Sequence, residues 1–114
     1  MVDRQTIKYF YVVDKFQECK KKVNSIIDCM QKELHLNRSL LKLVLDDEHS
    51  NEDVLAVFQG FNQSMNGAFG MVDKLTEPYL EEHEAEVRMM RDAALEVYDK
   101  AKELCYGVQG RIIE

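Results

Sequence analysis

Apolar residues recur at intervals of three and four along the first third of the chain. The series is Tyr9, Val12, Val13, Phe16, Cys19, Val23, Ile26, Ile27, Met30 and Leu34. Such spacing lines the side chains along one face of an α-helix, because 3.6 residues make one turn. The pattern therefore predicts a helix from about residue 4 to residue 36 with one buried face.

A second apolar stripe with the same period predicts a helix over residues 50–75. Ser50 is its expected N-cap, and two acidic residues follow, where the helix dipole favours negative charge. The dipeptide Asn66-Gly67 often forms turns, but the apolar period continues across it. We therefore expect this helix to be continuous.

Pro78 is the clearest break in the chain, and a third long helix is expected from Pro78 to about Tyr106. If the chain reverses at Pro78, the three helices form an up-down-up bundle within one molecule. If Pro78 only kinks one helix, the stripes on either side need a second chain. We prefer the reversal.

The short apolar run at residues 40–45 predicts a brief additional helix, after turn-forming residues at Asn37 and Ser39. The predicted fold is therefore all-α: an antiparallel bundle of three long helices plus one short helix. Dimerisation is the alternative means of completing its core. At 114 residues, the whole chain, 1–114, is expected to be a single domain.

Composition limits the environments in which such a chain would work. Hydrophobic residues make up 46% and charged residues 32%, which suits a folded domain with a solvated surface. The sequence contains no apolar run long enough to span a membrane and no signal-peptide pattern at its start. Three cysteines, an odd number, favour a reducing compartment. We expect a cytoplasmic protein, with the nucleus as the alternative.

The net charge of −6 argues against nucleic acid as a partner, since phosphate backbones require basic surfaces. The charge is also unevenly distributed. Residues 1–45 hold nine Lys and Arg against five Asp and Glu, whereas residues 46–114 hold six against sixteen. Either a basic first helix packs against acidic later helices, or an acidic surface faces a basic partner.

The segment 7–13 is apolar on more than one side. On a helix, Ile7, Phe10 and Tyr11 point more than about 120° away from the main stripe, so the helix has two neighbours. The second neighbour is either the chain's own segment 40–45 or another protein, for which aromatic residues are suitable anchors. A short β-strand is a third interpretation of this segment.

Two other features have both a structural and a functional interpretation. Gly60, Ser64 and Gly67 share one helix face and permit close approach of another helix, either inside the bundle or from a partner. Five acidic residues follow Lys74 with no basic residue before Arg88, and they form either a solvated face or a site for a basic protein surface. They are Glu77, Glu81, Glu82, Glu84 and Glu86.

The sequence predicts no catalytic, cofactor or metal site. A di-iron bundle needs Glu three residues before His on two helices, but Leu80 precedes His83 and Lys32 precedes His35 at that spacing. Asp46 is the one acidic residue at that distance from a histidine, and it falls at an expected loop. Cysteine and histidine do not cluster as zinc requires, and no phosphate-loop or nucleophile-elbow motif occurs.

We therefore predict a non-enzymatic protein–protein interaction module: an adaptor, a complex subunit or a dedicated binding partner that packs its helices against another protein or against itself. Ile7, Phe10 and Tyr11 are the predicted anchors, and Glu77, Glu81, Glu82 and Glu84 a predicted steering surface. One alternative is a small ligand- or metal-binding bundle or enzyme with a pocket lined by Met65, Met71, Met89 and Met90. The other is a peripheral protein of the membrane surface.

Overall fold

The computed structural model describes residues 4–46 and 51–113, and within these helices it describes side chains for residues 15–43 and 52–108. Three α-helices and one turn of 3-10 helix account for nearly all of these residues, and no strand occurs among them. The elements are α1 (Arg4–Asp46), α2 (Asn51–Thr76), η1 (Glu77–Tyr79) and α3 (Glu84–Ile113).

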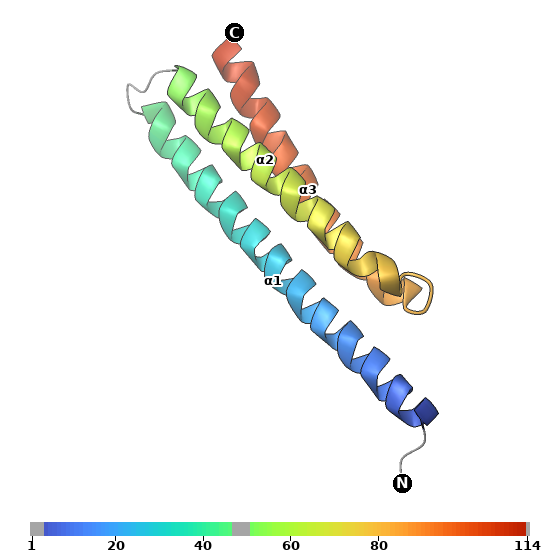
Figure 1. Ribbon diagram of the computed structural model, residues 1–114. Helices are drawn as coiled ribbons and strands as arrows, with labels where there is room; N and C mark the ends of the chain where they lie inside the picture. The colour runs from blue at the N-terminus through green and yellow to red at the C-terminus, as the bar shows by residue number, and fades with distance from the viewer. Residues whose placement is uncertain (1–3, 47–50, 114) are drawn as a thin grey trace.

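The three helices pack side by side along an elongated molecule of 71 × 20 × 16 Å (Figure 1). The Cys19 thiol lies 3.2 Å from the Leu75 carbonyl oxygen, so an early part of α1 lies beside the end of α2. The Tyr98 hydroxyl donates a 2.6 Å hydrogen bond to the Asn66 amide oxygen, which joins the middles of α2 and α3. The predicted packing of three long helices is confirmed.

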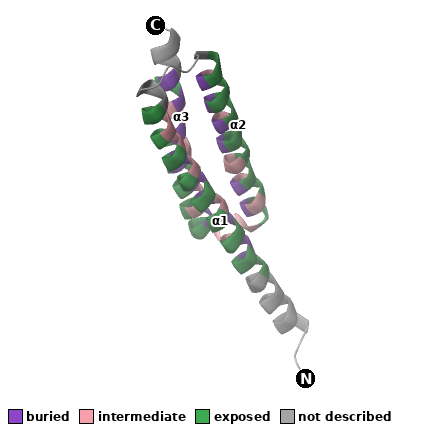
Figure 2. Ribbon diagram, turned by 90° about the vertical axis from the view of Figure 1, so that its left-hand side faces the viewer, coloured by how far each residue is buried: buried purple, intermediate pink, exposed green. Residues whose placement is uncertain are grey.

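One hydrophobic core runs between the helices for most of their length (Figure 2). Its buried members fall at the intervals of three and four that the sequence predicted, because those intervals place them on the inner face of each helix. They include Cys19, Val23, Ile27, Met30, Leu34, Phe58, Phe61, Met65, Val72, Ala94, Val97, Ala101, Cys105 and Val108.

The first helix is longer than predicted. The separate short helix expected at 40–45 is wrong, because this segment forms the last turns of α1. The chain between Arg4 and Asp46 holds neither glycine nor proline, and the Asn37 amide donates a 2.8 Å hydrogen bond to the Glu33 carbonyl one turn earlier. The β-strand interpretation of 7–13 is also wrong, since these residues lie within α1.

At its N-terminal end α1 extends beyond the other helices (Figure 1). Its 43 residues span about 65 Å, whereas the 26 residues of α2 span about 39 Å. Cys19 is level with Leu75, which is next to the last residue of α2. The turns of α1 that precede Phe16 therefore lie past the connection between α2 and α3.

The second helix is continuous across Asn66-Gly67, as predicted. No described glycine has a positive φ, so these glycines are ordinary helical residues. The expected cap, Ser50, lies outside the described residues.

The third helix begins at Glu84 rather than at Pro78. Pro78 stands near the start of η1, where its missing N–H is harmless, and further turns separate it from the first residue of α3. The connection between α2 and α3 therefore occupies the first residues of the predicted helix, and α3 starts after it. Because α2 and α3 pack on each other, Pro78 does not lie inside one kinked helix.

Aromatic rings and one arginine hold this connection in place. The Phe16 ring stacks on His83 with centroids 3.8 Å apart and lies 5.3 Å from the Tyr79 ring, which covers the end of the core. From α3, the Arg91 guanidinium donates to the Thr76 hydroxyl at 3.0 Å and to a Glu77 carboxylate oxygen at 2.9 Å. The end of α2 is thereby tied to the second turn of α3.

Candidate functional site

The predicted anchors lie on the part of α1 that extends beyond the bundle. Ile7, Phe10 and Tyr11 are within the helix, but their side chains fall outside the described ones. Their role in binding therefore stays a prediction. At the other end of α1, the segment 40–45 lies far from them along the same helix, so it is not their second neighbour.

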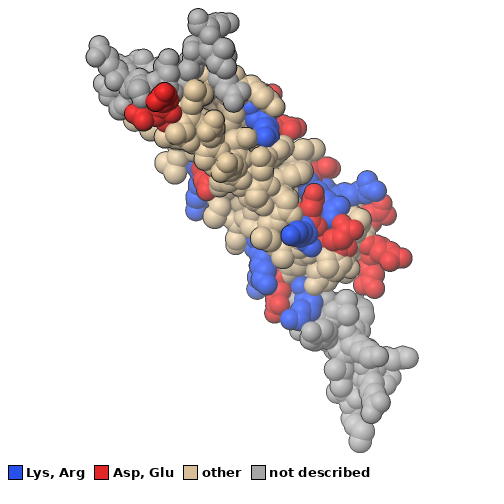
Figure 3. Space-filling model, turned by 45° about the horizontal axis from the view of Figure 1, so that its top comes forward, with Lys and Arg blue, Asp and Glu red and all other residues tan. Residues whose placement is uncertain are grey.

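The acidic residues after Lys74 are divided among separate ion pairs. Glu77 pairs with Arg91 at 2.9 Å, Glu84 with Arg88 at 2.8 Å, and Glu86 with Lys20 of α1 at 2.7 Å. The hydrogen bond from Lys20 is the main reason why the pKa of Glu86 lies below its ordinary value. Figure 3 shows acidic and basic side chains next to each other near this end of the molecule.

The two remaining acidic residues, Glu81 and Glu82, are exposed in the connection between α2 and α3. Three of the five carboxylates are thus already partnered within the chain. The sequence grouped all five in one acidic cluster, of which Glu77, Glu81, Glu82 and Glu84 were the predicted steering surface. In the structure, Glu81 and Glu82 lie between η1 and α3.

Two of the three cysteines lie in surroundings that suppress thiol reactivity. Cys19 and Cys105 are buried, and desolvation raises the pKa of both thiols, which favours the unreactive protonated form. Their sulfur atoms lie within hydrogen-bond distance of the Leu75 and Phe58 carbonyl oxygens, at 3.2 and 3.8 Å. Cys29 is exposed, and all three thiols are free.

The four methionines suggested as a pocket lining, Met65, Met71, Met89 and Met90, differ widely in burial. Met65 is buried in the core, whereas Met71 is 48% exposed on α2 and Met89 is 72% exposed on α3. Among the described residues, no group of three or more His, Cys, Asp or Glu side chains could hold a metal ion.

The grooves between pairs of helices differ in chemistry. The groove between α1 and α3 carries charged side chains, including Arg38, Glu96 and Lys100. The groove between α1 and α2 is mostly apolar and is lined by small side chains from α2. Its lining consists of Ser25, Ile26, Cys29, Met30, Glu33, Ser64, Gly67, Ala68 and Met71.

This groove continues onto an outer face of α2 that carries no charge. No Asp, Glu, Lys or Arg occurs between residues 54 and 72, in a chain whose charged fraction is 32%. We call the exposed residues of this stretch the α2 face, and Figure 3 shows a broad uncharged area over the side that α1 and α2 form. The α2 face consists of Ala56, Val57, Gln59, Gly60, Gln63, Ser64, Asn66, Gly67, Gly70 and Met71.

The glycines of the α2 face are not required by packing among the described residues. A Cβ atom placed on Gly60, Gly67 or Gly70 would meet nothing within 4 Å. Each glycine nevertheless costs a helix interior about 1 kcal/mol relative to alanine. Close packing inside the bundle, one of the two interpretations of Gly60 and Gly67, is therefore wrong.

Exposed apolar residues of α1 border the α2 face. Leu36 and Leu43 are 65% and 68% exposed, Leu40 is half-buried, and Cys29 is exposed in the groove. These residues follow one another at intervals of three, four and seven, so they form a second stripe beside the buried one. We call this stripe the α1 edge.

Known proteins do not identify the surface. No family model, curated protein or solved structure matches the chain. Within the described residues, no helix is both long and apolar enough to span a membrane.

The sequence predicted one part of the α2 face, the stripe of Gly60, Ser64 and Gly67, but not its full extent. The signal that would have found the face is the absence of charge between residues 54 and 72. Of the α1 edge, Leu40 and Leu43 were assigned to a separate short helix, whereas Cys29 and Leu36 were placed in the predicted first helix.

Proposed function

We propose that this chain is a non-enzymatic protein–protein interaction module of the cytoplasm or nucleus, an adaptor or complex subunit that binds through helix packing. Its scaffold is an up-down-up bundle, and its main binding surface is the α2 face with the α1 edge. The observation that carries the proposal is the uncharged, glycine-containing outer surface of α2.

The α2 face has the composition of a surface that another helix covers. A helix that remains in water normally carries charged residues on its outer side, as α1 does at Lys21, Asp28 and Lys32. Small residues allow two helix axes to approach to about 8 Å, the lower end of the usual range. The apolar side chains at its border, Val57, Met71 and the α1 edge, supply the area that such contact buries.

The extension of α1 provides a second contact under this proposal. Ile7, Phe10 and Tyr11 lie beyond the connection between α2 and α3, where no other described helix of the chain runs alongside. Among the acidic residues, Glu77 and Glu84 serve ion pairs within the chain, so Glu81 and Glu82 are the ones left to steer a basic partner.

The main experiment is affinity capture from extracts of the source cells with the tagged full chain. Gly67→Lys introduces a long charged side chain into the α2 face and should abolish capture of specific proteins identified by mass spectrometry. Gly107→Lys is the matched control, since Gly107 is also exposed, helical and free of neighbours within 4 Å of its Cβ. A chain that captures the same proteins with and without Gly67→Lys would contradict the role of the α2 face.

Tyr11→Asp tests the second contact. We expect circular dichroism of the variant to retain the helical content of the parent while partner binding falls, because the charge enters an apolar contact. Loss of the fold itself would show that Tyr11 belongs to the core, and the extension would then have no binding role.

A further inference from the structure

We propose that the α2 face and the α1 edge bind a second copy of this chain. The two α2 helices would run antiparallel about a two-fold axis that passes between Gln63 and Ser64. This proposal rests on the proposed function, since it names the partner of the same surface.

The spacing of large and small residues on the α2 face supports this arrangement. An antiparallel contact centred between Gln63 and Ser64 sets Gly60 opposite Gly67 of the second copy. The same register sets Val57 opposite Gly70 and Met71 opposite Ala56 of the second copy. Each exposed large side chain thus meets a small one, and the helix backbones meet where both copies have glycine.

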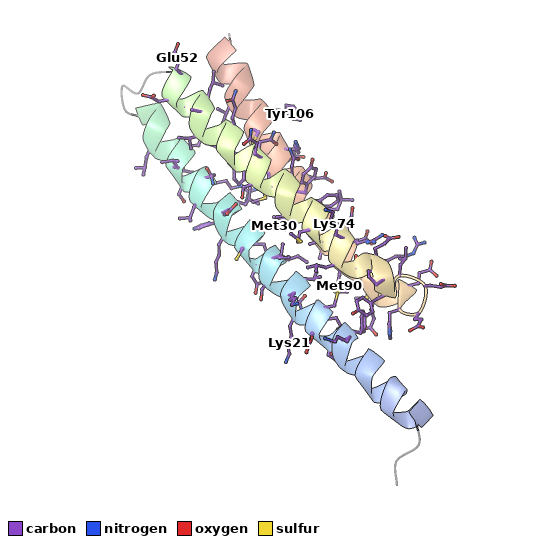
Figure 4. The ribbon with its side chains drawn as sticks, viewed as in Figure 1. Lys21, Met30, Glu52, Lys74, Met90 and Tyr106 are labelled. Carbon is purple, nitrogen blue, oxygen red and sulfur yellow. The ribbon has the colours of Figure 1, made fainter. Side chains whose placement is uncertain are left out.

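The charges that border the α2 face obey the same symmetry. Asp53 precedes the uncharged stretch, and Asp73 and Lys74 follow it. Asp53 and Lys74 are exposed, whereas Asp73 is half-buried and pairs with Arg91 of α3. Figure 4 shows Glu52, the neighbour of Asp53, and Lys74 near opposite ends of α2. In the proposed register, Asp53 of each copy lies opposite Lys74 of the other, so opposite charges meet at both ends of the contact.

Other registers lose this agreement. Shifting the second helix by one turn in one direction sets Val57 opposite Lys74, and in the other direction it sets Asp53 opposite Gly70. A face without charge also gives no preference to a strongly acidic or basic partner. One register therefore satisfies both the sizes and the charges, and it is self-complementary.

The α1 edge extends the same contact. Within one chain, Glu33 of α1 accepts a 2.9 Å hydrogen bond from Ser64, which aligns α1 with its own α2. Through the two-fold axis, Leu36 then comes level with Asn66 of the second copy and Leu40 with Gly70. These two leucines of α1 would thus lie along the glycine-containing part of α2 in the second copy.

The available area is that of a stable dimer. Two adjacent helices present a strip about 20 Å wide along the roughly 39 Å of α2, or on the order of 800 Å² per copy. Specific protein–protein interfaces bury about the same area on each partner.

Sedimentation equilibrium of the purified full chain tests the proposal directly. We expect a mass twice the 13.3 kDa of one chain, with the fraction of dimer falling on dilution. Gly67→Lys should raise the dissociation constant roughly 100-fold or more, because it places a charge between closely packed backbones twice in each dimer. Gly107→Lys on α3 should leave the constant unchanged.

Charge exchange and cross-linking test the register. Lys74→Glu should weaken the dimer by setting acidic groups opposite Asp53, and the double variant Asp53→Lys, Lys74→Glu should restore it. In a Cys29→Ser background, Gln63→Cys should form a disulfide-linked dimer on mild oxidation, since the two cysteines flank the axis. Ala93→Cys, exposed on α3, is the matched control and should not.

Each contrary outcome overturns a stated part of the reasoning. A chain that stays monomeric at every concentration up to about 1 mM overturns the second copy as partner. The proposed function then still stands if affinity capture depends on Gly67. A dimer that resists Gly67→Lys, or one that Lys74→Glu does not weaken, overturns the antiparallel α2 contact.

Discussion

Replacing Arg91 by Met should lower the free energy of unfolding by about 2 kcal/mol. Arg91 is the side chain of α3 that reaches the end of α2, and it is only 25% exposed. Met preserves most of the aliphatic stem and removes the guanidinium group. The substitution therefore isolates the polar contacts that hold α3 against α2.

The magnitude follows from the partners of the guanidinium. Its bond to the fully buried Thr76 hydroxyl, 3.0 Å long, is worth about 1–2 kcal/mol because it is charge-assisted and shielded from water. The ion pairs with Asp73 and Glu77 involve carboxylates that are 49% and 70% exposed, so each adds only about 0–1 kcal/mol.

Urea denaturation followed by circular dichroism at 222 nm measures this loss. A decrease of 2 kcal/mol moves the midpoint by about 1 M urea, at a slope of about 2 kcal/mol per molar. Arg88→Met is the matched control. Arg88 lies on the same helix, but its ion pair with Glu84 is exposed and local, so its removal should cost less than about 0.5 kcal/mol.

A double-mutant cycle with Thr76→Val decides whether the buried bond causes the effect. The Thr76 hydroxyl also donates to the Val72 carbonyl at 2.7 Å, so Thr76→Val is destabilising by itself. The two losses should nevertheless fall short of additivity by about 1 kcal/mol. Additive losses, or equal effects of Arg91→Met and Arg88→Met, would refute the reasoning.

Two further predictions concern thiol reactivity and pH. In the native monomer, a maleimide should label Cys29 rapidly and reach the buried Cys19 and Cys105 only on unfolding, and mass spectrometry of timed samples checks this order. The lowered pKa of Glu86 contributes stability that is complete above its ordinary value of 4.5 and is lost as pH falls through the folded value. Unfolding experiments between pH 7 and pH 3 should therefore show a smaller acid-induced loss for Glu86→Gln than for the parent; equal losses would contradict the role of Lys20.

The sequence was sufficient to predict the long helices and their buried faces. Residues such as Val23, Met65 and Val97 lie in stripes whose period matches the helix, and packing buried these stripes. At these positions the apolar period of the sequence and the packing of the three helices select the same residues for the core.

The helix boundaries were harder to predict because weak local signals compete. Asn37 and Ser39 favour turns, but nothing between them and Asp46 breaks a helix, and so α1 continues. At Pro78 the signal for an interruption was right, but the length of the connection depends on how α3 packs against α2.

The α2 face could not be assigned from sequence alone. The pattern shows that Gly60 and Gly67 share a side of the helix, but only the positions of α1 and α3 show that neither helix packs against that side. For Ile7, Phe10 and Tyr11 the sequence remains the source of the prediction.

The length and composition of α1 have a mechanical consequence. A helix of 43 residues without glycine or proline is a stiff element. A partner bound to the part of α1 that extends beyond the bundle is therefore held at a set distance and rotation from a partner bound near Leu36 and Leu43. The chain would then fix the distance and orientation between two bound partners as well as bind them, because both would be attached to one stiff helix without contacting each other.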